Sequence, residues 1–129
     1  MADDIDIDIT WDILDQDTVQ ALVERKGAVA LIDALNSSVP TPRDRAEELV
    51  ELAIKGRIKP LKENTAQFCD WAGEHGARRI ENTLIELDRV LASPKRGEAL
   101  LHAQALTRFI ARTINGDVTA LKAAIKAAD

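Results

Sequence analysis

The sequence is poor in the residues that build covalent or aromatic scaffolds. Among its 129 residues are one cysteine, two tryptophans, two phenylalanines and no tyrosine. The single cysteine, Cys69, excludes an internal disulfide framework and leaves no cysteine pair with which a zinc site would begin. We therefore expect a protein of a reducing compartment that holds no metal and no other cofactor.

Long apolar runs are also missing. No stretch approaches the roughly 18 uninterrupted apolar residues that a membrane span needs. The N-terminus, Met1-Ala2-Asp3-Asp4, is acidic where a secretory signal peptide is basic. The expectation is a cytoplasmic protein that is neither secreted nor inserted in a membrane, and the length is that of one domain.

The apolar residues, 46% of the chain, are mostly Ala, Leu, Ile and Val, and they fall at helical spacing. The clearest stripe predicts a helix over 42–55, with Thr41 as its N-cap, Pro42 at its first position and Gly56 after its end. The stripe repeats at i, i+3, i+4, i+7 and i+8, in Ala46, Leu49, Val50, Ala53 and Ile54.

Similar patterns predict helices over 60–75, 77–92 and 94–115, and a short final helix capped by Asp117. The predicted ends are Gly76, Ser93-Pro94 and Asn115-Gly116, and Ser93 is expected to cap the helix after it. Before residue 40 the pattern is weaker, with a capping box at Asp17 and a second short helix over 28–35, after Gly27.

These signals predict an all-α fold, an irregular antiparallel bundle of five or six helices in a single domain over 17–129. The residues expected to be buried together in one core are Leu49, Ile54, Leu84, Leu87, Phe109, Ile110 and Leu121.

The first 16 residues form an arm of unusual composition. Residues 1 to 17 carry seven aspartates and no base, which gives this segment a charge of −7. Since the net charge of the whole chain is −5, the rest of the chain carries about +2. Apolar and acidic residues alternate in Ile5, Asp6, Ile7, Asp8, Ile9 and Trp11, so an extended backbone would put the apolar side chains on one face. A lone strand leaves its backbone N–H and C=O groups unpaired, and the edge of another chain's sheet can form hydrogen bonds with them.

We expect this arm to bind another protein or a second copy of the chain, or to lie across its own helices. The alternative is an acidic arm whose apolar residues merely cover the core. The spacing of the aspartates does not match a calcium loop, because a glycine and a glutamate are missing at the required positions.

A basic turn and a tryptophan are the other candidate binding features. Arg57 and Lys59 lie between Lys55 and Lys62 with no acid among these four, so the turn is expected to receive the acidic arm or an anion. We do not expect nucleic acid, because no aromatic residue is interleaved and no glycine-rich phosphate loop is present. Trp71 is either a core residue or the anchor of a binding surface.

One spacing is typical of an enzyme. Arg96 and His102 are separated by five residues on a predicted helix. The pair resembles the Arg-x(4–6)-His motif of the HEPN ribonucleases, compact all-α domains that cleave RNA at a site shared between two copies. The resemblance covers seven residues, and Gly97 stands where the family commonly has a polar residue. It implies a ribonuclease in which Arg96 and His102 are catalytic.

No paired catalytic carboxylates, nucleophilic triad, metal-ligand set or phosphate loop can be identified in the sequence. The expected role is therefore a non-enzymatic one, in which the chain binds another macromolecule as an adaptor, an inhibitor or a small subunit of an assembly. A HEPN-like ribonuclease and an acidic mimic of nucleic acid are the alternatives.

Overall fold

The protein is all-α, as the sequence predicts. The computed structural model describes residues 12–129, and these form six helices and no strand. Their bounds are α1 Gln16–Lys26, α2 Ala28–Ser37, α3 Pro42–Lys55, α4 Ile58–His75, α5 Arg78–Leu91 and α6 Arg96–Ala128. The predicted arm residues Ile5, Asp6, Ile7, Asp8, Ile9 and Trp11 lie outside the described part of the chain.

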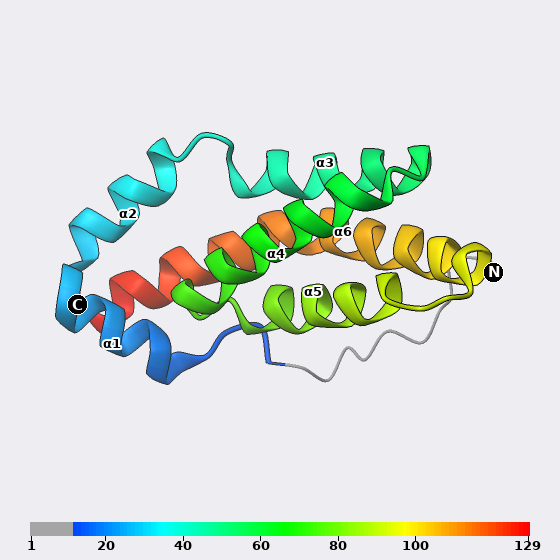
Figure 1. The fold of residues 1–129 in the computed structure, drawn as a ribbon. Coiled ribbons are helices and arrows are strands. Elements are labelled where there is room, and N and C mark those ends of the chain that lie inside the picture. The colour runs from blue at the N-terminus through cyan, green and yellow to red at the C-terminus, as the bar shows by residue number, and fades with distance from the viewer. Residues whose placement is uncertain (1–11) are drawn as a thin grey trace.

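Four helices form the main bundle. α3 packs on α4, α4 on α5, α5 on α6, and α6 back on α3, which closes a ring of four neighbours. α6 is long enough to continue beyond this bundle, and α1 and α2 pack on its C-terminal half (Figure 1). In the described residues no helix has the length and apolar character that crossing a bilayer requires.

The predicted caps of α3 and the predicted end of α4 are confirmed. Thr41 and Asp44 form a reciprocal capping box, in which the Asp44 amide donates to Thr41 Oγ1 at 3.0 Å and the Thr41 amide donates to Asp44 Oδ2 at 3.3 Å. Gly56 and Gly76 end α3 and α4 in the left-handed conformation, with φ of 67° and 73°.

The predicted single core is in fact two apolar clusters. The larger one joins α3, α4, α5 and the first half of α6, and includes Leu49, Phe68, Leu84, Leu87 and Ile110. The second joins α1 and α2 to the end of α6, and includes Val19, Leu22, Leu31, Leu121 and Ile125. Leu121 is therefore buried as predicted, but in the second cluster.

Two predicted core residues are less buried than expected. The side chain of Ile54 is 59% exposed, because the buried arc of α3 is centred on Leu49 and Ile54 lies about 140° around the helix from it. Leu52 occupies the other edge of that arc and is buried instead. Phe109 is half-buried, with the guanidinium of Arg79 5.9 Å from its ring centre.

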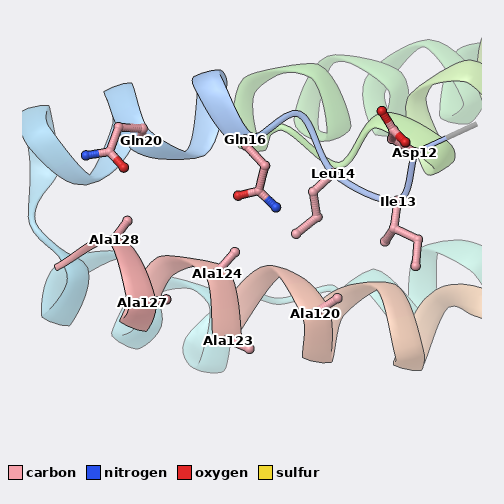
Figure 2. A pocket seen from close by; sticks show the side chains of 10 residues that line it. All are labelled: Asp12, Ile13, Leu14, Gln16, Gln20, Ala120, Ala123, Ala124, Ala127 and Ala128. Atoms are coloured by element: carbon pink, nitrogen blue, oxygen red, sulfur yellow. The ribbon is translucent and has the colours of Figure 1, made fainter.

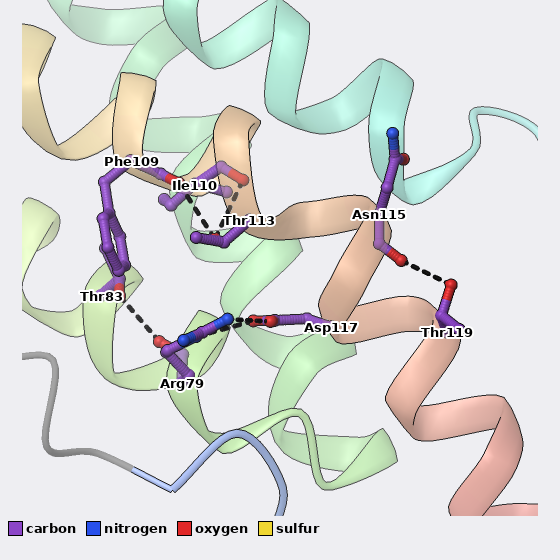
Figure 3. A network of polar contacts seen from close by, with 8 residues as sticks. All are labelled: Arg79, Thr83, Phe109, Ile110, Thr113, Asn115, Asp117 and Thr119. Carbon is purple, nitrogen blue, oxygen red and sulfur yellow. Dashed lines mark hydrogen bonds and ion pairs between the residues drawn. The ribbon is translucent and has the colours of Figure 1, made fainter.

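The predicted break at Asn115-Gly116 is wrong, because α6 runs without interruption for 33 residues. Gly116 is not among the glycines with positive φ, and Asp117 is buried inside the helix rather than capping a new one. The Asp117 carboxylate is held by the Arg79 guanidinium of α5 (Figure 3). The helix stays intact because the side chains of Ile114, before Gly116, and Leu121, after it, are both buried.

Two helix starts are displaced by two residues from the predicted caps. Asp15, not Asp17, caps α1 by accepting a hydrogen bond from the Thr18 amide at 3.3 Å. α6 begins at Arg96 with Lys95 at the N-cap position, and Ser93 Oγ accepts from the Lys95 amide at 3.2 Å, ahead of the helix.

Candidate interaction site

The root of the arm is fixed on the turn between α4 and α5. The Asp15 amide donates to the Gly76 carbonyl oxygen at 2.8 Å, and the Arg79 amide donates to the Ile13 carbonyl oxygen at 3.2 Å. Leu14 is buried in the second cluster. Gly76 is required here twice over, because its φ is positive and a Cβ would lie 3.0 Å from the Asp15 carbonyl oxygen.

Ion pairs add to these backbone contacts. Arg78 Nη2 lies 3.1 Å from Asp15 Oδ2, and Arg78 Nη1 lies 3.8 Å from Asp12 Oδ2. The hydrogen bonds from Thr18, and then the charge of Arg78, lower the pKa of the Asp15 carboxyl. The sequence does not mark Arg78 as a partner of the arm, because Arg78 follows the end of a helix and lies far along the chain from Asp12 and Asp15.

An open groove begins at this root. It has a volume of ≈ 1010 Å³ and lies between residues 12–20 and the last turns of α6 (Figure 2). One wall carries Asp12, Ile13 and the two glutamines of α1, and the other is made of alanines. Those alanines are Ala120, Ala123, Ala124, Ala127 and Ala128.

The predicted basic turn lies at the opposite end of α4 from the arm root (Figure 1). Arg57 and Lys59 are exposed there, and neither forms an ion pair with the described residues. The fold adds Arg96, the first residue of α6 after the α5–α6 turn, since Lys62 and Arg96 line one pocket of ≈ 230 Å³. This basic end therefore gathers charge from two turns, and sequence order shows only one of them.

Trp71 joins the two apolar clusters. Its ring packs against both of them, lies 5.7 Å from the Phe68 ring and stacks on His75 at 4.8 Å. The His75 Nδ1 in turn is 2.8 Å from the Trp71 carbonyl oxygen. Trp71 is half-buried, so it packs on the core with one part and leaves another part at the surface.

Arg96 and His102 lie on different sides of α6. Six residues turn a helix by about 240° and advance it by roughly 9 Å, so the two side chains do not share a face. Arg96 is exposed at the first residue of α6, and half-buried His102 lies near Glu86. The Glu86 carboxyl has a lowered pKa, mainly through its hydrogen bonds with Arg89 and in smaller part through His102.

Nothing in the described residues gathers ligands for a metal. No group of three His, Cys, Asp or Glu side chains lies close enough together over 12–129. Burial, followed by the nearby Glu81, raises the pKa of the Cys69 thiol, which keeps it protonated at neutral pH.

Comparison of the chain with family models, with curated proteins and with solved structures finds no match.

Proposed function

We propose that this chain is a non-enzymatic interaction protein, an adaptor, inhibitor or small subunit, that binds another protein through its N-terminal arm. The binding residues would be Ile5 to Ile9 and Trp11. The helical surface contributes Arg57 and Lys59 at the basic end and the exposed part of Trp71.

The observation that carries this proposal is the fixed root of the arm. Residues 12–15 are held by two backbone hydrogen bonds and by Arg78, so the arm leaves the body at a defined point. A binding segment that is already tethered and aimed loses less freedom when it meets its partner. Each large apolar side chain of the arm contributes about 1.5–3 kcal/mol when it is fully buried.

Deletion of residues 1 to 8 tests the proposal, because it leaves every described contact of the root in place. Light scattering after size-exclusion chromatography, together with capture of partners from the host, should show lost association of the truncated chain with unchanged helical circular dichroism. Equal association and equal partner recovery for the two chains would refute a binding role for the arm.

Charge reversal at Arg57 and Lys59 distinguishes the contribution of the basic end to partner binding from that of the arm. If the basic end contributes to binding, the double variant should bind the recovered partner more weakly, with a smaller dependence on salt. The matched control is Arg43→Glu on α3, whose side chain is exposed and pairs only with Glu47 among the described residues.

An RNA-cleavage assay tests the ribonuclease alternative. The folded protein should leave RNA intact, because Arg96 and His102 lie on different sides of α6. Cleavage that disappears in both Arg96→Ala and His102→Ala, with folding preserved, would replace the proposed function by an enzymatic one.

A further inference from the structure

One pocket at the basic end is built from two parts of the chain that are far apart in sequence. It has a volume of ≈ 230 Å³ and lies where the first turn of α4 meets the turn between α5 and α6, at the same end of the bundle (Figure 1). Three polar side chains line it, those of Lys62, Ser93 and Arg96. The remaining lining residues are apolar, and they are Ile58, Leu91, Ala92, Pro94 and Ala99. We call this cavity the basic pocket.

The two cations of the basic pocket come from different helices, and no carboxylate pairs with them. Lys62 belongs to α4 and Arg96 begins α6, and neither forms an ion pair with any residue of 12–129. Glu63 and Glu98, the nearest acids in sequence, lie about 100° and 200° around the same helices from them, and neither lines the pocket. Two cations gathered at one cavity favour a ligand that carries negative charge.

The apolar side of the pocket is part of the core, which fixes its shape. Leu91 and Ala99 are buried members of the larger apolar cluster, and Ile58 packs against that cluster. The turn between α5 and α6 is held by its backbone, because the Ser93 amide donates to the Val90 carbonyl oxygen at 3.0 Å. A site whose backbone is already ordered loses less freedom when a ligand binds.

A phosphate monoester matches these donors better than a carboxylate does. It has three acceptor oxygens and a charge of about −1.5 to −2 at neutral pH, whereas a carboxylate has two oxygens and a single charge. The forked Arg96 guanidinium can bind two of the phosphate oxygens, and the Lys62 ammonium can bind the third. Ser93 Oγ accepts from the Lys95 amide at 3.2 Å and forms no other hydrogen bond within the described chain, so its proton can be donated to the same anion.

A duplex nucleic acid fits this end less well than one phosphate group does. A duplex carries a charge about every 1.7 Å along its axis, so it needs a basic surface that extends well beyond one pocket. The exposed side chains of α3, which ends at the basic end, include the acids Glu47, Glu48 and Glu51. These carboxylates would repel a long polyanion, whereas a single phosphate group in the pocket lies away from them.

We propose that the basic pocket binds a phosphate monoester carried by the partner protein, with Lys62 and Arg96 on its oxygens and Ser93 as a further donor. This inference rests on the proposed function in taking the partner to be a protein, and it adds the chemical group that the basic end recognises. Arg57 and Lys59 are exposed at this end but do not line the pocket, so they contact the partner chain beside the phosphorylated residue. Partner binding at this end then depends on phosphorylation of the partner.

Titration of the full chain with inorganic phosphate and with a short phosphoserine peptide, rich in glycine and alanine, tests the site. Backbone amide shifts in nuclear magnetic resonance spectra locate the ligand, and they should move over 58–62 and 93–99 but not at the arm root. The same peptide with serine or glutamate in place of phosphoserine is the control. The phosphopeptide should bind at least about tenfold more tightly than either control peptide, because it alone offers three oxygens and the larger charge.

Three results of these titrations would overturn the proposal. Equal binding of the phosphopeptide and its glutamate form would show that the basic end recognises negative charge and not phosphate. Inorganic phosphate that binds as tightly as the phosphopeptide would replace the protein source by a free anion. A short RNA or DNA duplex that binds more tightly than the phosphopeptide would replace the protein partner by nucleic acid.

Paired substitutions distinguish the pocket from the general charge of the basic end. Lys62→Gln with Arg96→Gln should weaken binding of the phosphopeptide and of inorganic phosphate at least about tenfold, since both charged hydrogen-bond donors are lost. Arg57→Gln with Lys59→Gln is the matched control, because it removes one arginine and one lysine from the same end outside the pocket, and it should change binding of inorganic phosphate by less than about twofold. Equal losses in the two double variants, or unchanged binding in the first, would refute the pocket as the site.

Failure of this site and failure of the proposed function are distinguishable. The titrations need no partner, whereas the deletion of residues 1 to 8 measures partner recovery and association state. Phosphopeptide binding at the pocket, together with unchanged partner recovery after the deletion, would support the site and refute the arm as the binding element. Phosphatase treatment of a recovered partner should weaken its binding to the unchanged chain but not to the double variant of Lys62 and Arg96, and equal weakening for both chains would contradict recognition at the pocket.

Discussion

The buried ion pair between Arg79 and Asp117 gives the sharpest prediction about stability. The two residues lie 38 positions apart on α5 and α6, and Arg79 Nε donates to Asp117 Oδ2 at 3.2 Å while a second guanidinium nitrogen donates to Oδ1. The Asp117 side chain is 0% exposed and that of Arg79 is 19% exposed. Water can therefore reach the cation but not the carboxylate, and the two partners are not equivalent.

Arg79→Met should cost the protein about 3–5 kcal/mol of unfolding free energy, because it leaves a buried carboxylate without its counter-charge. The stacking of the cation on Phe109 adds roughly 0.5–1 kcal/mol to this loss. Asp117→Asn should cost less, about 1–3 kcal/mol, because an acceptor remains and Arg79 keeps its access to water. Replacing both residues, Arg79→Met with Asp117→Leu, should recover most of the loss.

Urea unfolding followed by far-ultraviolet circular dichroism measures the unfolding free energy of the unchanged chain, the two single variants and the double variant. In a chain of this size the Arg79→Met loss corresponds to a fall in Tm of roughly 10–25 °C. A double variant as unstable as Arg79→Met would show that packing and not charge dominates. Losses below about 1 kcal/mol in both single variants would show that the pair is hydrated and that the argument from burial is wrong.

Three further predictions separate local sequence signals from tertiary ones. Gly116→Ala should stabilise the protein by about 0.5–1 kcal/mol, since it lies inside a helix with nothing near its Cβ position, whereas Gly76→Ala should destabilise it; thermal melts that rank them the other way would contradict the account of α6. Leu87→Ala should cost about 2–5 kcal/mol and Ile54→Ala far less, because only the first is buried; equal urea midpoints would refute the assigned core. Asp15 stabilises the fold where it is ionised, so this contribution is complete at neutral pH and is lost as the pH falls below its ordinary pKa of 3.8 and through its lowered folded value. Asp15→Asn should therefore show a shallower acid dependence of Tm, and parallel curves would contradict it.

Several features of this protein follow from the sequence alone, because they depend on residues within one helical turn of each other. Thr41, Asp44 and Gly56 fix the ends of α3 through capping and a left-handed glycine, and the sequence predicts both. The apolar spacing of α5 likewise predicts which of its residues are buried, including Leu84 and Leu87. The acidity of the arm and the basic charge of the body are facts of composition.

Other features depend on which helices meet. Asn115-Gly116 has the local form of a helix end, yet α6 continues through it because its two sides are buried against different clusters and Arg79 binds Asp117. Ile54 fits the apolar period but lies outside the arc that α4 and α6 cover. Arg78 receives the arm root only because α4 turns back into α5 at Gly76. Local spacing specifies helices and their faces, but the contacts between residues far apart in sequence decide where a helix ends, which of its apolar residues is buried, and where the arm is anchored.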